Sequence, residues 1–188
     1  MQEKIELRRA IKERLTRMSE NDRRVESQII VRELRKMLPE SMTTIAVYFP
    51  YLDEPDIQSL VAELLEQKNV ICLPKAEMHG MTMHRIRSLD DVQKNPVTGI
   101  FEPIEPAPLD ETTIAIVIIP GRAFLRTGER LGRGNGGYDR WISDQRKRNP
   151  ETRFIGVCFD CQIVQEMPTE QHDEKVDVVL SATEFKKA

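Results

Sequence analysis

Four segments of the chain carry apolar residues at helical spacing. In the first, Leu7, Ile11 and Leu15 fall on one face while basic side chains line another. Ser19 and Asp22 form a reduced capping box at the start of the second. We therefore predict helices over residues 2–18, 19–38, 56–65 (capped by Asp56) and 138–148.

Between these helices lie short runs rich in β-branched residues. The run TIAIVIIPG is the longest and most uniformly apolar, which is typical of a strand buried on both faces. A proline-rich stretch over residues 96–108 predicts irregular structure. The predicted strands cover residues 44–49, 70–74, 81–86, 113–121, 153–159 and 176–180.

Strands that alternate with helices indicate an α/β fold. We expect a single three-layer domain over residues 1–188, with a largely parallel central sheet of about six strands flanked by helices. In open sheets of this kind, ligands bind beyond the carboxyl ends of the strands. The loops after Phe49, Pro120 and Phe159 are therefore expected to line one cleft.

Composition and charge narrow the class of protein. The chain has 188 residues, 39% hydrophobic and 31% charged, and its net charge of −3 gives no global basic field for nucleic acid. No apolar run approaches the roughly 20 residues of a membrane helix, and the start of the chain does not read as a signal peptide. We expect a cytoplasmic protein.

Cys158 and Cys161 form a C-x-x-C pair, which is compatible with a redox pair or with half of a zinc site. Cys72 and the scattered histidines supply no second paired motif for zinc. Cys158 also lies within the apolar run FIGVCF, so we interpret the pair as structural.

Four glycines within six residues stand out in the segment RLGRGNGGYDR, at residues 130–140. Glycine permits positive φ and close approach of the backbone to a ligand. Backbone N–H groups exposed in this way can surround an anion, and Arg130 and Arg133 add donors suited to phosphate oxygens. The segment predicts a polyphosphate site.

Two other interpretations of this segment are open. Gly132, Gly134 and Gly137 formally satisfy G-x-G-x-x-G, but about ten residues separate them from the preceding strand, where a dinucleotide fingerprint needs a direct turn. No Gly-Lys-Ser/Thr follows, so a P-loop is disfavoured. A plain surface loop is the remaining alternative, and the adjoining arginines argue against it.

Several charged residues have both a structural and a functional interpretation. Asp139 can favour the dipole of its helix or hold Mg²⁺ beside phosphates, and Asp173 can be a solvated loop charge or a second carboxylate for the metal. Taken alone, Lys4 and Arg8 read as a solvated helix face, and Glu54 as a surface charge.

Taken together, these residues resemble the 5-formyltetrahydrofolate cyclo-ligase family along nearly the whole chain. The run RLG-x-G-x-G-x-YD is the specific element of this resemblance. The weaker elements occur in the family's order and comprise K-x-x-L-R at Lys4–Arg8, Tyr48–Glu54, Gly99/Glu102/Pro103, PG-x-AF at Pro120–Phe124, Tyr138-Asp139-Arg140 and His172-Asp173.

The resemblance implies an ATP-dependent ring closure. The formyl oxygen of 5-formyltetrahydrofolate is phosphorylated by ATP, a neighbouring folate nitrogen attacks the activated carbon, and phosphate leaves to give 5,10-methenyltetrahydrofolate and ADP. Phosphoryl transfer depends mainly on positioning and on neutralising charge, which suits backbone amides, arginines and Mg²⁺.

The resemblance also implies roles for individual residues. Arg133 and Tyr138 would be catalytic, Phe49, Glu54 and Tyr138 would contact the folate, and Asp139 and Asp173 would serve Mg²⁺. The residues expected to contact ATP are Lys4, Arg8, Arg130, Leu131, Gly132, Arg133, Gly134, Asn135, Gly136, Gly137 and Tyr138.

Two positions depart from the family's pattern. Gly137 replaces the first of two tyrosines that commonly precede the aspartate, and Leu125 replaces an acidic residue. Gly137 motivates a rival hypothesis, a nucleotide- or folate-binding protein without turnover. A dinucleotide-dependent oxidoreductase is the second rival. We expect a monomer that acts on a reduced folate and ATP, without nucleic-acid or membrane partners.

Overall fold

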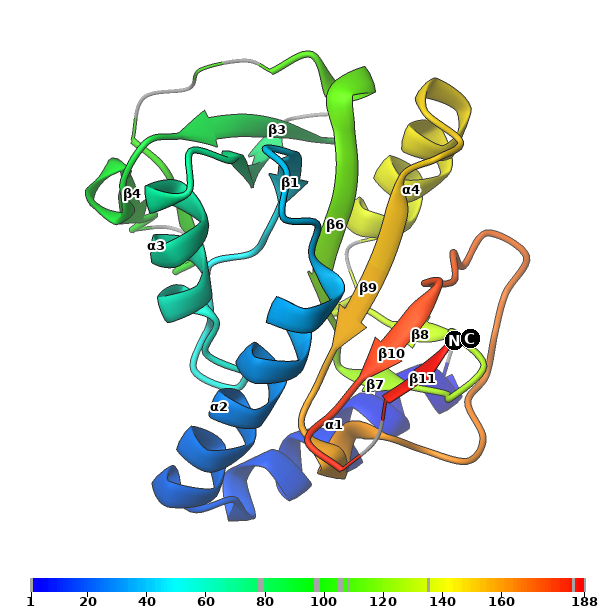
Figure 1. The fold of residues 1–188 in the computed structure, drawn as a ribbon. Coiled ribbons are helices and arrows are strands. Elements are labelled where there is room, and N and C mark those ends of the chain that lie inside the picture. The colour runs from blue at the N-terminus through cyan, green and yellow to red at the C-terminus, as the bar shows by residue number, and fades with distance from the viewer. Residues whose placement is uncertain are drawn as a thin grey trace.

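A seven-stranded sheet forms the centre of the structure, a computed structural model that describes residues 2–77, 80–96, 99–104, 107, 109–134, 136–183 and 185–187. Its strands are β1 (Thr44–Ala46), β2 (Val70–Glu77), β3 (Gly80–Ile86), β6 (Ile114–Pro120), β9 (Arg153–Val157), β10 (Val178–Leu180) and β11 (Phe185–Lys187). They lie in the order β11-β10-β9-β6-β1-β2-β3 (Figure 1).

The inner strands run parallel, and the two edge strands, β3 and β11, pair antiparallel with their neighbours. The prediction of an α/β fold with a largely parallel sheet is confirmed, and all six predicted strands belong to the sheet. The seventh strand, β11, was not predicted, because three residues at the end of a chain carry no periodic signal.

Helices cover both faces of the sheet. The four helices are α1 (Gln2–Arg17), α2 (Glu20–Met37), α3 (Gln58–Glu66) and α4 (Gly137–Arg148). α2 and α3 pack on one face and α4 on the other (Figure 1). Alternation along β1 divides its side chains between the two layers, with Ile45 facing α2 and α3 and Ala46 facing α4.

The helix starts follow local polar chemistry. Ser19 caps α2, accepting a hydrogen bond from the backbone N of Asp22 at 3.1 Å as the capping box predicted. At α3 the expected cap is displaced by one residue. Ile57 holds the N-cap position, where it makes no side-chain cap bond, while Asp56 accepts from the backbone N of Gln58 at 2.9 Å.

Shorter elements shape the carboxyl end of the sheet. The predicted irregular stretch contains a strand, β5 (Phe101–Pro103), which pairs with β4 (Val92–Lys94). The reason is packing, since the ring of Phe101 lies against that of Phe49 with centroids 4.6 Å apart. A second hairpin joins β7 (Ala123–Phe124) to β8 (Arg130–Leu131). The described residues also form three short 3₁₀ helices, η1 (Leu89–Asp91), η2 (Glu111–Thr113) and η3 (Asp160–Gln162).

Across the part of the chain that the structure describes, we find no helix with the length and apolar character needed to span a membrane.

Candidate functional site

The glycine-rich loop is held at both ends. It leaves β8, where Leu131 pairs with Ala123 of the neighbouring strand, and it enters α4 directly at Gly137. Gly134 and Gly136 have φ values of +115° and +64°, a conformation that side-chain-bearing residues rarely adopt. The loop therefore presents backbone at the N-terminus of a helix, a favourable place for an anion. Asn135, predicted to belong to the cradle, lies outside the described residues.

Helix α1 approaches this loop from the far end of the sequence. The Arg8 Nε donates to the backbone oxygen of Gly132 at 2.9 Å. A Cβ on Gly134 would lie 3.5 Å from the Arg8 Cζ, an ordinary contact distance, so the loop and the guanidinium are close neighbours, and the positive φ alone disfavours a side chain there. The structure thus brings Arg8 and the glycine loop together, as predicted.

Lys4 is buried, and its ammonium group is paired with two carboxylates. Its Nζ lies 2.6 Å from Asp173 and 3.1 Å from Glu170. Burial opposes the charged form of Lys4, but the bonds to these carboxylates outweigh burial and raise the pKa of Lys4. The same balance lowers the pKa of Asp173.

Arg130 is almost fully buried beneath the loop. Its Nη2 lies 2.8 Å from Asp139, and its guanidinium sits over the Tyr138 ring, 5.4 Å from the centroid. Its Nε has no hydrogen-bond partner within the described residues. A buried charged donor left unpartnered is costly.

A cavity of about 330 Å³ opens between the glycine loop and the loop after β1. Eight of the predicted site residues line it: Glu54, Arg130, Gly132, Arg133, Gly136, Gly137, Tyr138 and Asp139. The rest of the lining is more apolar and contains one carboxylate, Glu102, among Tyr48, Tyr51, Pro74, Ala76, Met81, Ile100, Pro120 and Gly121. One wall therefore suits an anion, and the other suits a flat, partly apolar molecule.

Arg133 joins the two walls. Its Nη2 lies 2.8 Å from Glu54 Oε1 and 2.7 Å from Asp53 Oδ1, and its guanidinium lies 4.8 Å from the centre of the Tyr51 ring. Glu54 is fixed on the other side, because its second oxygen accepts from the backbone N of Tyr51 at 2.9 Å. The predicted phosphate-side arginine and the predicted folate-side carboxylate thus meet directly.

Tyr138 and Tyr48 remain protonated near neutral pH. Burial, and then the charge of Glu54, raises the pKa of Tyr138 and that of Tyr48. The Tyr48 hydroxyl donates to the backbone oxygen of Pro55 at 2.7 Å, which fixes the loop that carries Glu54. Tyr138 can act as a neutral hydrogen-bond donor and is unsuited to act as a base.

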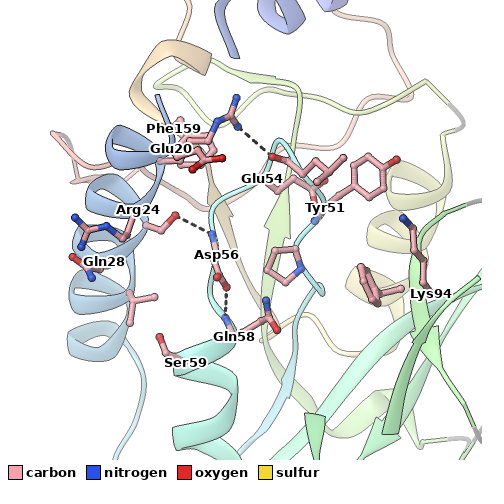
Figure 2. A pocket seen from close by; sticks show the side chains of 16 residues that line it. Glu20, Arg24, Gln28, Tyr51, Glu54, Asp56, Gln58, Ser59, Lys94 and Phe159 are labelled. Carbon is pink, nitrogen blue, oxygen red and sulfur yellow. Dashed lines mark hydrogen bonds between the residues drawn. The ribbon is translucent and has the colours of Figure 1, made fainter. Parts of the chain in front are cut away.

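A larger groove of about 620 Å³ shares Tyr51 and Glu54 with this cavity. Arg24 and Gln28 of α2 line it on one side, and Lys94 lines it on the other (Figure 2). Phe159 lines this groove, whereas Pro120 lines the smaller cavity. The loops predicted to share one cleft therefore border two adjoining spaces.

Phe49 and Leu131 lie behind the cavity. Phe49 packs its ring on Phe101 and is absent from the described residues that line the 330 Å³ space. Leu131 is buried against α1 and contributes its backbone oxygen to the N–H of Arg122 at 2.6 Å. Both residues support the walls of the cavity.

The two predicted metal ligands occupy neighbouring spaces. Asp139 lines the main cavity, whereas Asp173 lines a smaller one of about 140 Å³, and Arg130 borders both. Each carboxylate forms an ion pair with a basic side chain, Asp139 with Arg130 and Asp173 with Lys4. Asp139 fits a metal bound beside phosphate oxygens, because carboxylate oxygen is the ligand type that Mg²⁺ takes.

The C-x-x-C cysteines are free thiols, Cys158 buried and Cys161 half-buried. Burial raises the pKa of Cys161 to about 11 and that of Cys158 well above its ordinary value. Thiolates are the reactive species, so these groups are poor redox nucleophiles, in keeping with a structural interpretation.

Sequence reasoning missed part of the site. Asp53, Arg122 and Tyr51 take part in the charged network, and Met81 and Ile100 line the cavity. Asp53 stands beside the predicted Glu54 and Arg122 directly follows the PG pair, so nearness to a predicted residue was the one signal for them. Nothing in the edge-strand pattern singled out Met81.

Comparisons with known proteins agree on one family. The sequence profile described as the 5-formyltetrahydrofolate cyclo-ligase family matches residues 1–182. The chain is 26% identical to the mouse 5-formyltetrahydrofolate cyclo-ligase, covering 93% of this chain and 91% of that protein. It is 30% identical to the Haemophilus influenzae protein of the same name, covering 88% of each.

Solved structures give the same result. The NMR structure of the Aquifex aeolicus 5,10-methenyltetrahydrofolate synthetase superposes with a TM-score of 0.82 at 30% identity, covering 98% of this chain and 92% of that one. A Mycoplasma pneumoniae 5,10-methenyltetrahydrofolate synthetase, 20% identical, shares the fold with a TM-score of 0.77 over 95% of this chain and 98% of that one.

Proposed function

The chain belongs to the 5-formyltetrahydrofolate cyclo-ligase family, and we propose that it converts 5-formyltetrahydrofolate to 5,10-methenyltetrahydrofolate with ATP and Mg²⁺. In this reaction the formyl oxygen accepts the γ-phosphoryl group of ATP and ADP is released. The neighbouring folate nitrogen then attacks the formyl carbon and gives up its proton, and the C–O bond breaks as phosphate leaves.

One observation carries the proposal beyond the family name. The Arg133 guanidinium lies 2.8 Å from Glu54 in a cavity with a glycine-loop wall and an aromatic wall. Phosphoryl transfer requires the two reactants to meet at such a junction, with a cation where charge develops. Arg133 is therefore the residue that we assign to the transferring phosphoryl group.

On the nucleotide side, the chain supplies donors from three elements. The backbone of Gly132, Gly134, Gly136 and Gly137 would surround the phosphates, because the positive φ of Gly134 and Gly136 exposes N–H groups where the loop enters α4. Arg8 and Arg130 would add charge, and Lys4 would contact ATP after exchanging a carboxylate for a phosphate oxygen. The cradle that we propose also includes Leu131 and Asn135.

On the folate side, Glu54 would bind the hydrogen-bonding edge of the pterin ring. Tyr138 would contact both substrates as a neutral donor, consistent with its raised pKa. The pterin would lie against the apolar wall, and Phe49 would act by supporting that wall through Phe101.

We assign Mg²⁺ to Asp139, together with phosphate oxygens and water, and keep Asp173 as the second candidate carboxylate. Bound there, the ion would neutralise phosphate charge during transfer. Arg130 would hold Asp139 in place and move its charge toward the phosphates when the ion pairs with the carboxylate.

Residues 1–188 would act as a single domain and as a monomer in the cytoplasm. The family profile spans residues 1–182, which supports one functional unit. The main cavity is lined by four separate stretches between Tyr48 and Asp139, so no smaller piece would carry it.

A spectroscopic turnover assay tests the proposal. Purified protein is mixed with 5-formyltetrahydrofolate, ATP and Mg²⁺, and the absorbance of the methenyl product is followed. We expect product that depends on ATP and on the metal. Bound ATP without product under every metal condition would indicate a binding protein, the alternative that Gly137 motivates. Tight NAD binding without competition from ATP would instead favour an oxidoreductase.

A further inference from the structure

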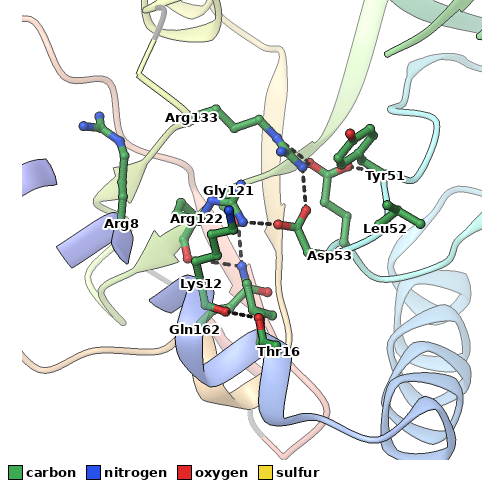
Figure 3. A network of polar contacts seen from close by, with 12 residues as sticks. Arg8, Lys12, Thr16, Tyr51, Leu52, Asp53, Gly121, Arg122, Arg133 and Gln162 are labelled. Carbon is green, nitrogen blue, oxygen red and sulfur yellow. Dashed lines mark hydrogen bonds and ion pairs between the residues drawn. The ribbon is translucent and has the colours of Figure 1, made fainter. Parts of the chain in front are cut away.

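One carboxylate, Asp53, pairs with two arginines, Arg122 and Arg133, of which Arg133 lines the cavity. Its Oδ1 lies 2.7 Å from the Arg133 Nη2, and its Oδ2 forms an ion pair with the Arg122 Nη1 (Figure 3). The side chains of Asp53 and Arg122 are 20% and 13% exposed, so this pairing is mostly sheltered from water. Burial alone would raise the pKa of Asp53, but the two arginines outweigh it and hold that pKa below its ordinary value.

Each partner of Asp53 is fixed to a different part of the fold. The Arg122 backbone donates to Leu131 of the β8 strand and accepts from Gln162 at 3.2 Å. Arg133 belongs to the glycine loop. Asp53 itself belongs to the turn after β1, closed by the Glu54 backbone N donating to the Tyr51 oxygen at 2.9 Å. The carboxylate therefore connects the turn after β1 to both ends of the β7–β8 hairpin, 69 and 80 residues away in sequence.

Arg133 has two carboxylate partners here, and the proposed reaction places different demands on them. Glu54 would turn to the folate, and Arg133 would turn to the phosphates. Asp53 lines neither cavity described above, so substrate would not displace it directly. The ion pair with Arg122 would still compensate the charge of Asp53 if Arg133 shifted.

We propose that Asp53 is a positioning residue for the phosphoryl transfer, holding Arg133 at the boundary between nucleotide and folate when Glu54 binds its substrate. This inference rests on the proposed function. Asp53 acts through Arg133 and touches neither substrate. Its effect should fall on the step in which Arg133 stabilises developing charge.

The test uses Asp53→Asn, which keeps the shape of the side chain and removes its charge. Displacement of a catalytic group by about 1 Å can lower the reaction rate about 100-fold. We therefore expect kcat to fall about 10- to 100-fold. KM for both substrates should change by less than about threefold, because ground-state contacts are retained. The matched control is Glu63→Gln, which breaks the bidentate Arg35–Glu63 pair between α2 and α3, and it should leave kcat unchanged.

A double variant separates positioning from a general structural effect. In an Arg133→Lys background, Asp53→Asn should cost less than about threefold further, since residues that act together are not additive. Equal losses in both backgrounds, or a wild-type kcat in Asp53→Asn alone, would overturn the inference while leaving the proposed function intact.

Hydrogen exchange of the ligand-free protein gives a readout that does not need activity. Asp53→Asn should speed exchange at the amides of Gly132, Arg133 and Gly134, whereas Glu63→Gln should not. Unchanged exchange there would count against the inference even if the wild type produced no methenyl folate. Absence of product from the wild type is the separate result that removes the proposed function.

Discussion

The two ends of the parallel strands hold polar side chains in different ways. Beyond the carboxyl ends, cations pair with carboxylates from remote segments, as Arg133 does with Glu54 and Lys4 does with Asp173. These pairs span 79 and 169 residues of sequence. Both partners are charged, so a phosphate or a metal ion can replace one of them.

Beyond the amino ends, the charged pair of Arg148 with Glu111 lies beside buried neutral side chains that bond to backbone and to each other. The Gln145 Nε2 donates to the Glu111 oxygen at 2.9 Å and to the Thr152 hydroxyl at 3.0 Å. The Thr152 hydroxyl donates to the Ile114 oxygen at 2.7 Å. Backbone partners cannot be replaced by a ligand, so these bonds stabilise the fold, whereas the carboxyl ends carry ion pairs between side chains.

The largest expected effect is at Arg133. Arg133→Ala removes the cation from the junction of the two walls, and kcat should fall about 10³-fold, equivalent to about 4 kcal/mol of barrier. The matched control at the opposite end is Arg148→Ala, which breaks the pair with Glu111 and should leave kcat within about twofold. Steady-state turnover at saturating substrates checks both. A variant that keeps a tenth of wild-type turnover contradicts the role of Arg133.

Asp139→Asn should produce the next largest effect, a fall in kcat of about 100-fold, or about 2.7 kcal/mol. If Asp139 holds Mg²⁺, the metal concentration needed for half-maximal rate should rise as well. Asp144→Asn, on the exposed side of the same helix, is the control. An unchanged metal requirement with reduced kcat would mean that Asp139 serves to hold Arg130.

Much of the fold could be predicted because its signals are local. The continuous apolar run of β6 and the Ser19 cap depend on a few neighbouring residues, and both were predicted. The β4–β5 hairpin was missed because its stability comes from Phe101 packing on Phe49, a contact between residues more than fifty positions apart. Short strands with tertiary support carry little periodic signal.

The site divides along the same line. The glycine loop could be predicted from composition, because four glycines in six residues have few structural uses. The pairing of Asp53 with Arg122 and Arg133 depends on which loops the strand order brings together, and spacing in the sequence carries no trace of it. The burial of Lys4 was likewise hidden, because the carboxylates that compensate it lie at the other end of the chain.

At the amino ends, Gln145→Ala should cost stability and spare turnover. It removes a fully buried amide and leaves the Glu111 oxygen without that donor, a loss of about 2 kcal/mol. The melting temperature should fall by about 4–8 °C. Thermal unfolding and kcat at 25 °C are the measurements, and a loss of kcat beyond about twofold would break the distinction between the two ends.

The smallest expected effect is on the stability of Lys4→Met, and its dependence on pH distinguishes the two ends of the strands. Lys4→Met removes the pair with Asp173 and should lower stability by about 1 kcal/mol, or about 2–4 °C, near neutral pH. The raised pKa of Lys4 means that its contribution is complete below 10.5 and is lost as the pH rises through its folded pKa. The lowered pKa of Asp173 means that its contribution is present above pH 3.8 and is lost as the pH falls through its folded pKa.

The difference in stability between wild type and Lys4→Met should therefore stay constant from pH 5 to pH 9 and disappear in acid below pH 3.8. The Gln145→Ala deficit involves no titrating group and should persist in acid, so parallel curves for Lys4→Met across the whole range would show that this pair does not carry exchangeable charge.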